Sequence, residues 1–264
     1  MSESKELTTA ESKELATLYS DLGIEEMAGM NREDMTSADD YAMPFLSLLQ
    51  SASPQCKKSD ARYIKGAEEG VFFNTVTNEL YGEEVTIVPV AYRSAWVEWV
   101  LREDGGGYKG EFPPGKQPPI VARDEKNRDL LENGHELKDT RYWYVLIVTE
   151  EGFEPAVMGL TRTQLKPSKR LANMTAEDKW PDNVKRGKAP PFFVWQYNIR
   201  SVPQQSDEYA FVNYEFSRGA PVTDRALLEA AKALREAVKA GQVREATESL
   251  DEGMAEADDE SASY

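Results

Sequence analysis

The residues best suited to chemistry in this chain are a run of cations between residues 162 and 188 with a tryptophan among them. The run carries eight bases against three acids, a local charge of +5. Single-strand binding needs cations that follow a phosphate backbone and rings on which bases stack. Trp180, between Lys179 and Pro181 in a polar stretch, is the ring best suited to stacking. The pattern therefore predicts a nucleic-acid site with little sequence preference.

Structural interpretations compete with this one. Phe193, Trp195, Tyr197 and Ile199 alternate along one predicted strand, and such alternation is typical of a strand face that packs on the core. Trp195 is therefore assigned to the core rather than to the site. The cations at residues 162–170 are also typical of a solvated helix face, because their spacings of three and four place most of them on one side.

A second group of cations lies in and just after a predicted loop at residues 51–58, where four bases up to residue 65 stand against Asp60 alone. We assign it to the same binding surface. The predicted nucleic-acid-binding residues are Lys57, Lys58, Arg62, Lys65, Arg162, Lys166, Lys169, Arg170, Trp180, Lys185, Arg186 and Lys188.

The net charge of −16 would argue against a nucleic-acid partner if it were spread over the whole chain, but it is concentrated at the two ends. Residues 1–40 hold eleven acids and three bases, and residues 245–264 hold eight acids and no base. Residues 41–244 hold 28 of each, so the globular part is neutral and the whole-chain charge says little about it. The acidic C-terminal segment is predicted to be disordered, because low hydrophobicity with uncompensated charge does not offset the ordering entropy.

Catalytic motifs are absent from the sequence. There is no GxxxxGK[ST], GxSxG or HExxH, and one cysteine (Cys56) with one histidine (His135) makes neither a zinc site nor a disulfide. The abundant carboxylates leave a two-metal nuclease as an alternative, but no D/E-x-K cluster ends a predicted strand. We predict a protein that is not an enzyme and has no cofactor or metal. With no apolar run of membrane length and no signal-like start, it is expected in the cytoplasm.

The elements that would position these residues are mainly strands. Apolar runs with β-branched and aromatic composition predict them at residues 71–77, 85–92, 95–101, 142–149, 155–160, 192–202 and 209–216. Turn residues at 77–79 and 81–83 separate the first two runs, and the first three form a predicted meander. Pro89 must lie at an edge or a bulge, because it has no N–H for a ladder. Five strands by residue 160 match the number in an OB-type barrel.

Helices are predicted at residues 40–50, after a cap at Thr163, and at residues 223–240. The last has Thr223 as its cap, Gly241 at C′ and an apolar stripe that should pack on the sheet. Residues 103–141 are predicted to be a long loop rich in glycine and proline with a helical turn at 127–131, either a flap over a groove or an insertion without a role. The predicted fold is α+β: an antiparallel, OB-like barrel or sheet with packed helices and acidic termini. Residues 1–40 form an acidic arm, 41–241 one nucleic-acid-binding domain, and 242–264 the tail.

Four segments resemble a family of phage-encoded single-stranded DNA-binding proteins and, more loosely, a phage DNA-binding RNA polymerase cofactor. They are MPFLSLLQSASPQCKK, NTVTNELYGEEVTIVPVAY, DTRYWYVLIV and GLTRTQLKPSKR, and they span roughly residues 41–217. The resemblance implies single-stranded DNA binding in phage replication, recombination or transcription, in the cytoplasm of the infected cell. It also implies that the acidic tail contacts a replication or transcription protein, through Asp258, Asp259, Glu260 and Tyr264.

Two alternatives remain beside this interpretation. An acidic tail often only keeps a protein soluble. An acidic protein can also mimic DNA and sequester a host DNA-processing enzyme, in which case it would bind no oligonucleotide at any ionic strength. The sequence leaves the oligomeric state open, including a homo-oligomer.

Overall fold

The chain divides into two units, residues 1–41 and 42–264. The computed structural model describes residues 42–246 of the second unit, apart from 114, 182–186 and 206–209. The expected N-terminal arm, and the tail from residue 247 onward, lie outside the described residues.

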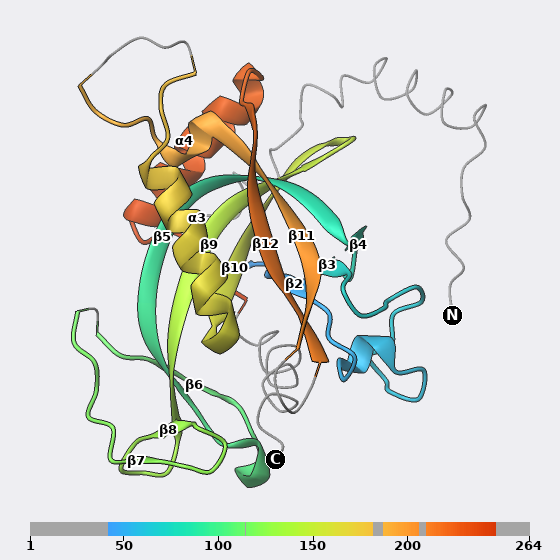
Figure 1. The fold of residues 1–264 in the computed structure, drawn as a ribbon, viewed down its shortest axis with the longest axis vertical. Helices are drawn as coiled ribbons and strands as arrows, with labels where there is room; N and C mark the ends of the chain where they lie inside the picture. The colour runs from blue at the N-terminus through green and yellow to red at the C-terminus, as the bar shows by residue number, and fades with distance from the viewer. Residues whose placement is uncertain (1–41, 114, 182–186, 206–209, 247–264) are drawn as a thin grey trace. The chain divides into compact units, whose positions relative to one another are not determined.

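Most of the described chain is antiparallel β-structure that curls into a half-barrel with two short α-helices packed against it (Figure 1). This confirms the predicted α+β class. An eight-stranded sheet has the order β12-β11-β5-β9-β8-β7, and β10 and β6 pair with β9 and β5 respectively. A three-stranded sheet, β2-β3-β4, and a parallel pair, β1-β13, complete the set. The strands are Ala42–Met43 (β1), Leu46–Leu48 (β2), Phe72–Asn74 (β3), Leu80–Gly82 (β4), Glu84–Trp99 (β5), Tyr108–Glu111 (β6), Ala122–Arg123 (β7), Asp129–Leu130 (β8), Glu136–Thr149 (β9), Gly152–Thr161 (β10), Trp195–Gln205 (β11), Ala210–Pro221 (β12) and Arg244–Glu245 (β13).

The first described segment corrects a prediction, because residues 42–50 of the predicted helix at 40–50 do not form a helix. β1 and β2 flank Pro44, and β2 pairs with β3 in the register Leu46↔Asn74. Phe45, buried between them, bridges to Val157 of β10. The apolar residues are buried as expected, but strand partners from other parts of the chain satisfy the backbone that a helix would have satisfied internally. In the predicted turn at residues 81–83, Tyr81 and Gly82 are part of β4, and only Glu83 is a bend.

β5 is one 16-residue strand rather than two separate strands of a meander. It pairs with β11 near its start and with β9 over most of its length. The register with β9 shifts between Pro89 and Ala91, so Pro89 lies at a bulge in an internal strand. The predicted bulge is confirmed, and a bulge is how a strand interior accommodates a residue without an N–H.

The predicted loop at residues 103–141 is paired in part, which corrects its assignment as irregular throughout. It contains β6, β7 and β8, and β9 begins at Glu136 rather than at residue 142. The predicted helical turn is instead a hairpin turn, in which Asn127 has φ 57°. There Arg128 donates to Asp124 (2.6 Å) and to Glu103 (2.5 Å). Its guanidinium holds the pKa of Glu103 down at about 2. Sequence periodicity misses such a segment because its strands are two to four residues long.

The two α-helices are Leu165–Ala176 (α3) and Arg225–Lys239 (α4). The N-cap of α4 is Asp224, whose carboxylate accepts from the Ala226 N–H at 2.8 Å, rather than the predicted Thr223. Gly241 has φ 69°, as predicted for C′. The apolar stripe of α4 packs in the clusters that contain Val88, Val90 and Tyr144 of the sheet, which confirms the predicted docking. Short 3₁₀ segments lie at Pro54–Cys56 (η2), Arg102–Asp104 (η3), Arg162–Gln164 (η4) and Phe192–Val194 (η5).

The start of the predicted C-terminal tail is part of the folded domain, which corrects its boundary. β13 pairs with β1, with Glu245 opposite Met43. The Glu245 carboxylate lies 2.7 Å from the Arg93 guanidinium and accepts from the Tyr144 hydroxyl. Arg93 also pairs with Glu111 at 2.5 Å. Glu245 is therefore an anchor, and only the residues beyond Ala246 remain available as a tail.

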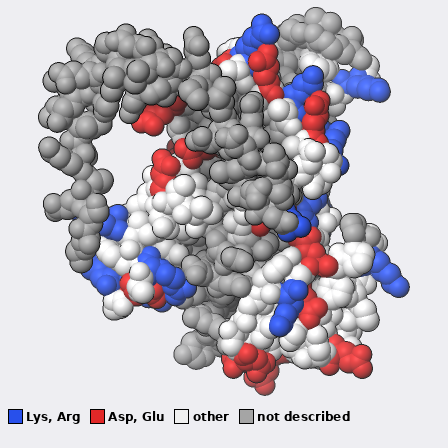
Figure 2. Space-filling view, turned by 180° about the vertical axis from the view of Figure 1, so that it is seen from behind, with Lys and Arg blue, Asp and Glu red and all other residues white. Residues whose placement is uncertain are grey.

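Figure 2 shows the molecule from behind the view of Figure 1, and the described surface on this face carries mixed charge. Lys and Arg side chains alternate there with Asp and Glu side chains. Such mixing agrees with the equal numbers of acids and bases in the globular part. Any cationic site must therefore be a local arrangement.

Candidate nucleic-acid interface

The clearest local arrangement of cations is the outer face of α3. Lys166, Lys169 and Arg170 are exposed there, whereas Leu171 and Ser168 on the opposite face are buried. In the part of the chain that the structure describes, none of these three cations forms an ion pair. Three unpaired positive charges on one helix face are a surface that an anionic polymer can approach without displacing an internal partner.

The core fixes the orientation of this face. α3 lies against β9, β10 and β12, and Leu171 belongs to the main hydrophobic cluster. The indole N–H of buried Trp143, on β9, donates to the Ser168 hydroxyl at 2.9 Å. This hydrogen bond ties the buried side of α3 to the sheet and leaves its cations facing solvent.

The start of α3 differs from the prediction. The chain enters α3 through η4, where Thr161 and Gln164 rather than Thr163 make the capping contacts, with the Thr161 N–H donating to Gln164 Oε1 at 3.2 Å; the N-cap of α3 itself is Gln164. Arg162 lies between them at φ 45°, a left-handed conformation that costs a non-glycine residue free energy. Its guanidinium pairs with the buried carboxylate of Glu136. Arg162 therefore has a structural partner and is not part of the unpaired face of α3.

The cations of residues 51–65 do not join this face. Lys57, Lys58 and Lys65 are exposed, but their loop (blue in Figure 1) lies on the opposite side of β11 and β12 from α3. Arg62 pairs with Asp60 at 3.0 Å, and this contact lowers the pKa of the aspartate to about 2. The structure thus separates the two groups of predicted phosphate-binding residues.

Two tryptophans hold the segment after α3: Trp180 bonds within the segment, and Trp195, the first residue of β11, ties it to the sheet. The Trp180 indole N–H donates to the Lys188 carbonyl at 2.8 Å, and the Trp195 N–H donates to the Lys179 carbonyl at 2.9 Å. Trp195 is half-buried, with the Arg218 guanidinium 5.4 Å from its ring centre. It packs at the margin of the main core cluster, as does Phe192. Trp195 therefore serves as a core-edge anchor, close to its predicted role.

Asp178 adds a buried charge beneath this segment. Its carboxylate accepts from the Tyr197 hydroxyl and pairs with Arg218. Burial raises the pKa of Asp178, while the contacts with Tyr197 and Arg218 oppose the rise. The same burial raises the pKa of Tyr197. The trio joins the end of α3 to β11 and β12, so the exposed Lys179 next along the chain extends from a fixed support.

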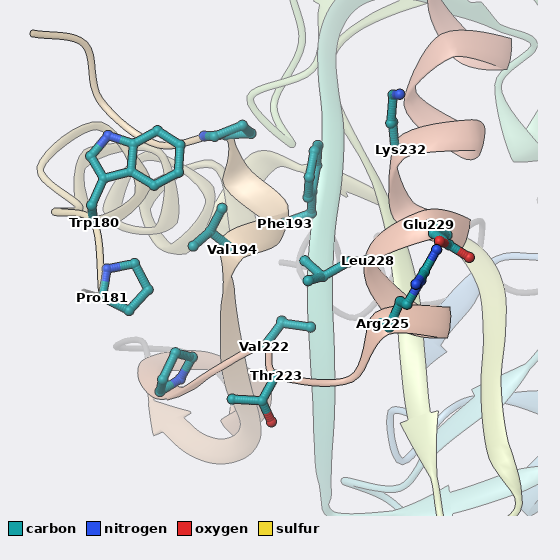
Figure 3. Close-up of a pocket in the computed structure, with 12 residues that line it drawn as sticks. Trp180, Pro181, Phe193, Val194, Val222, Thr223, Arg225, Leu228, Glu229 and Lys232 are labelled. Carbon is teal, nitrogen blue, oxygen red and sulfur yellow. The ribbon is translucent and has the colours of Figure 1, made fainter. Parts of the chain in front are cut away.

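An apolar pocket beside Trp180 was not predicted from the sequence. Its cavity volume is about 640 Å³. Figure 3 shows Trp180 and Pro181 on one side, Val194, Phe193 and Val222 in the middle, and the side chains of α4 on the other side. Its lining residues are Trp180, Pro181, Pro191, Phe193, Val194, Pro221, Val222, Thr223, Arg225, Leu228, Glu229 and Lys232.

The pocket was missed because its walls come from three separate segments. Phe193 had been placed on the core face of a strand, but it lies in η5, before β11 begins. The only signal in the sequence was the recurrence of proline beside aromatic residues at 180–181 and 190–193. That recurrence indicates an irregular apolar surface without saying what it faces.

Several predicted residues lie outside the described part of the chain, namely Lys185, Arg186, Asp258, Asp259, Glu260 and Tyr264. Within the described residues, no group of three or more His, Cys, Asp or Glu side chains is arranged to hold a metal ion. Neither of the helices described above is long and apolar enough to cross a membrane.

Comparison with known proteins gives one family. A family model described as Pam3 phage gp34-like protein matches residues 11–244. No curated protein and no solved structure matches the chain significantly.

Proposed function

The chain belongs to the Pam3 phage gp34-like protein family, and from this premise we propose that it is a non-enzymatic phage single-stranded DNA-binding protein. It would act in replication, recombination or transcription of phage DNA. Under this proposal the half-barrel takes the part of an OB-like barrel, as a rigid support that presents a cationic, aromatic surface to one strand. The acidic terminal residues would contact a protein partner.

The observation that carries the proposal is the exposed cationic face of α3 together with an aromatic pocket lined by Trp180. Among the described residues no carboxylate pairs with Lys166, Lys169 or Arg170, and Lys179 and Lys188 are exposed next to Trp180. Phosphate contacts from such residues require no base identity. Rings beside them supply stacking, which every base can provide.

The phosphate contacts can be tested by changing Lys166, Lys169 and Arg170 together to alanine. Each phosphate contact contributes roughly 0.7 to the slope of log K against log salt for a single strand. We therefore expect the slope to fall by up to about 2 and the affinity to fall most at low salt. Fluorescence anisotropy with a labelled oligonucleotide over a salt series measures both.

The chain contains a matched control for this variant. Changing Lys57, Lys58 and Lys65 to alanine removes the same charge from exposed positions on the other side of β11 and β12. We expect this variant to keep most of the slope. An unchanged slope in the α3 variant, with a normal melting temperature, would refute the assignment of α3. A wild-type protein that binds no oligonucleotide at any salt concentration would favour the DNA-mimic alternative instead.

A further inference from the structure

We infer that the apolar pocket beside Trp180 receives an unstacked base of single-stranded DNA, while the phosphates on either side of that base lie on the cations outside it. This inference rests on the proposed function and adds where a base would bind. It assigns a role to residues of η5 and of α4 that the cationic pattern does not include.

The walls of the pocket are suited to a flat apolar ring. The cavity volume of about 640 Å³ lies within the range of small-ligand sites, roughly 300–1,000 Å³. Trp180 and Phe193 contribute aromatic rings, and Pro181, Pro191 and Pro221 add rigid apolar surfaces. The Trp180 N–H donates to the Lys188 carbonyl, which fixes the indole in the wall of the pocket. Binding there would depend on stacking and burial and would tolerate any base.

The charged lining residues of the pocket all come from α4. Arg225 and Glu229 pair with each other at 2.7 Å, which leaves Lys232 as the lining cation without a carboxylate partner among the described residues. Lys188 adjoins the Trp180 side through the indole hydrogen bond. A nucleotide has the matching layout, with an apolar ring joined to an external anion.

A peptide with an apolar anchor residue is the competing occupant. It would use the same apolar walls, but it would not need the exposed cations of α3 or the exposed Lys179 and Lys188. Because of those cations, an anionic polymer matches the surroundings of the pocket better than a peptide does. We therefore commit to the nucleobase and leave the peptide as an outcome of the test.

The test compares two oligomers with the same number of phosphates, oligo-dT and an abasic oligomer of equal length. One stacked base contributes about 1–3 kcal/mol, which is about 5- to 150-fold in affinity. Wild-type protein should therefore bind oligo-dT tighter than the abasic oligomer by at least about fivefold. Trp180→Ala should lose most of that difference and keep its affinity for the abasic oligomer, and Trp180→Phe should keep most of the difference.

Two further variants test the cavity itself. Thr223 is an exposed lining residue, and Ala226 is exposed on the same turn but does not line the pocket. Thr223→Met should fill the cavity and reduce oligo-dT binding alone, whereas Ala226→Met should change neither affinity. Because both positions are on the surface, this pair remains informative if Trp180→Ala does not fold.

The outcomes separate this inference from the proposed function. Equal affinity of wild-type protein for the two oligomers, or equal loss for both in Thr223→Met, would overturn the base pocket while phosphate binding stands. A Thr223→Met protein with unchanged oligo-dT affinity would also overturn it and would leave the pocket to a peptide. Binding to neither oligomer at any salt concentration would instead refute the proposed function.

Discussion

Replacing Trp143 by alanine is expected to lower the free energy of unfolding by about 3–5 kcal/mol, the range for removing a large buried aromatic side chain. Trp143 is 1% exposed, and its ring centre lies 4.8 Å from that of Tyr92 and 5.8 Å from that of Phe192. Its N–H also holds α3 through Ser168. We therefore expect weaker binding of single-stranded DNA below the melting temperature as well, because the cationic face loses its fixed orientation. Urea unfolding and anisotropy measure the two effects.

Two variants distinguish the effect of Trp143 on the orientation of α3 from its effect on the stability of the domain. Trp99→Ala removes a comparable ring, 5% exposed and packed 5.7 Å from Tyr108, in a cluster that contains no residue of α3. It should destabilise the domain without changing DNA affinity in the folded state. Ser168→Ala leaves the indole N–H without its acceptor and should cost about 1–3 kcal/mol. If Trp99→Ala weakens DNA binding as much as Trp143→Ala does, the orientation of α3 is not the cause.

Truncation before Glu245 and truncation after Ala246 are expected to give proteins of different thermal stability. Removing residues 247–264 takes away seven acids and no base, and none of the described contacts. Removing residues 245–264 also deletes the acceptor of the Tyr144 hydroxyl and one carboxylate partner of Arg93. Because the Arg93 side chain is 31% exposed and keeps Glu111, we expect this second truncation to cost about 1–3 kcal/mol, the range for a charged hydrogen bond and its desolvated partner. Thermal melts of the two forms measure the difference.

The shorter truncation also tests the acidic tail as a competitor of DNA. A polyanion tethered beside a cationic face has an effective concentration in the millimolar range, and its attraction to that face is strongest when salt is low. Removing residues 247–264 should therefore tighten DNA binding at low salt and matter less at high salt. Equal affinity of the two forms at low salt would reduce the tail to a solubilising role. Glu245→Gln in the full chain is the control, because it removes the charge of the anchor and leaves the tail in place.

The sequence by itself determined the features that depend on local chemistry. The buried strand around residues 142–149, the bulge at Pro89, the glycine C′ of α4 and the one-sided cations of α3 all follow from residue type and spacing. Each rests on a short-range cause: a missing N–H, a positive φ or the 3.6-residue period of a helix. The neutral core and acidic ends also follow from counting charges.

Only the tertiary structure decided the features that depend on distant partners. Residues 46–48 form a strand because β3 pairs with them and the preceding Phe45 bridges to β10, and Glu245 is held in place because Arg93 and Tyr144 contact it from β5 and β9. The cations at 57–65 and those of α3 are alike in sequence, yet the sheet separates them. The pocket beside Trp180 is made from three segments, each unremarkable alone. Local sequence patterns do not predict which distant strands pair. The free energy that selects the pairing comes from contacts that form only when the chain has folded.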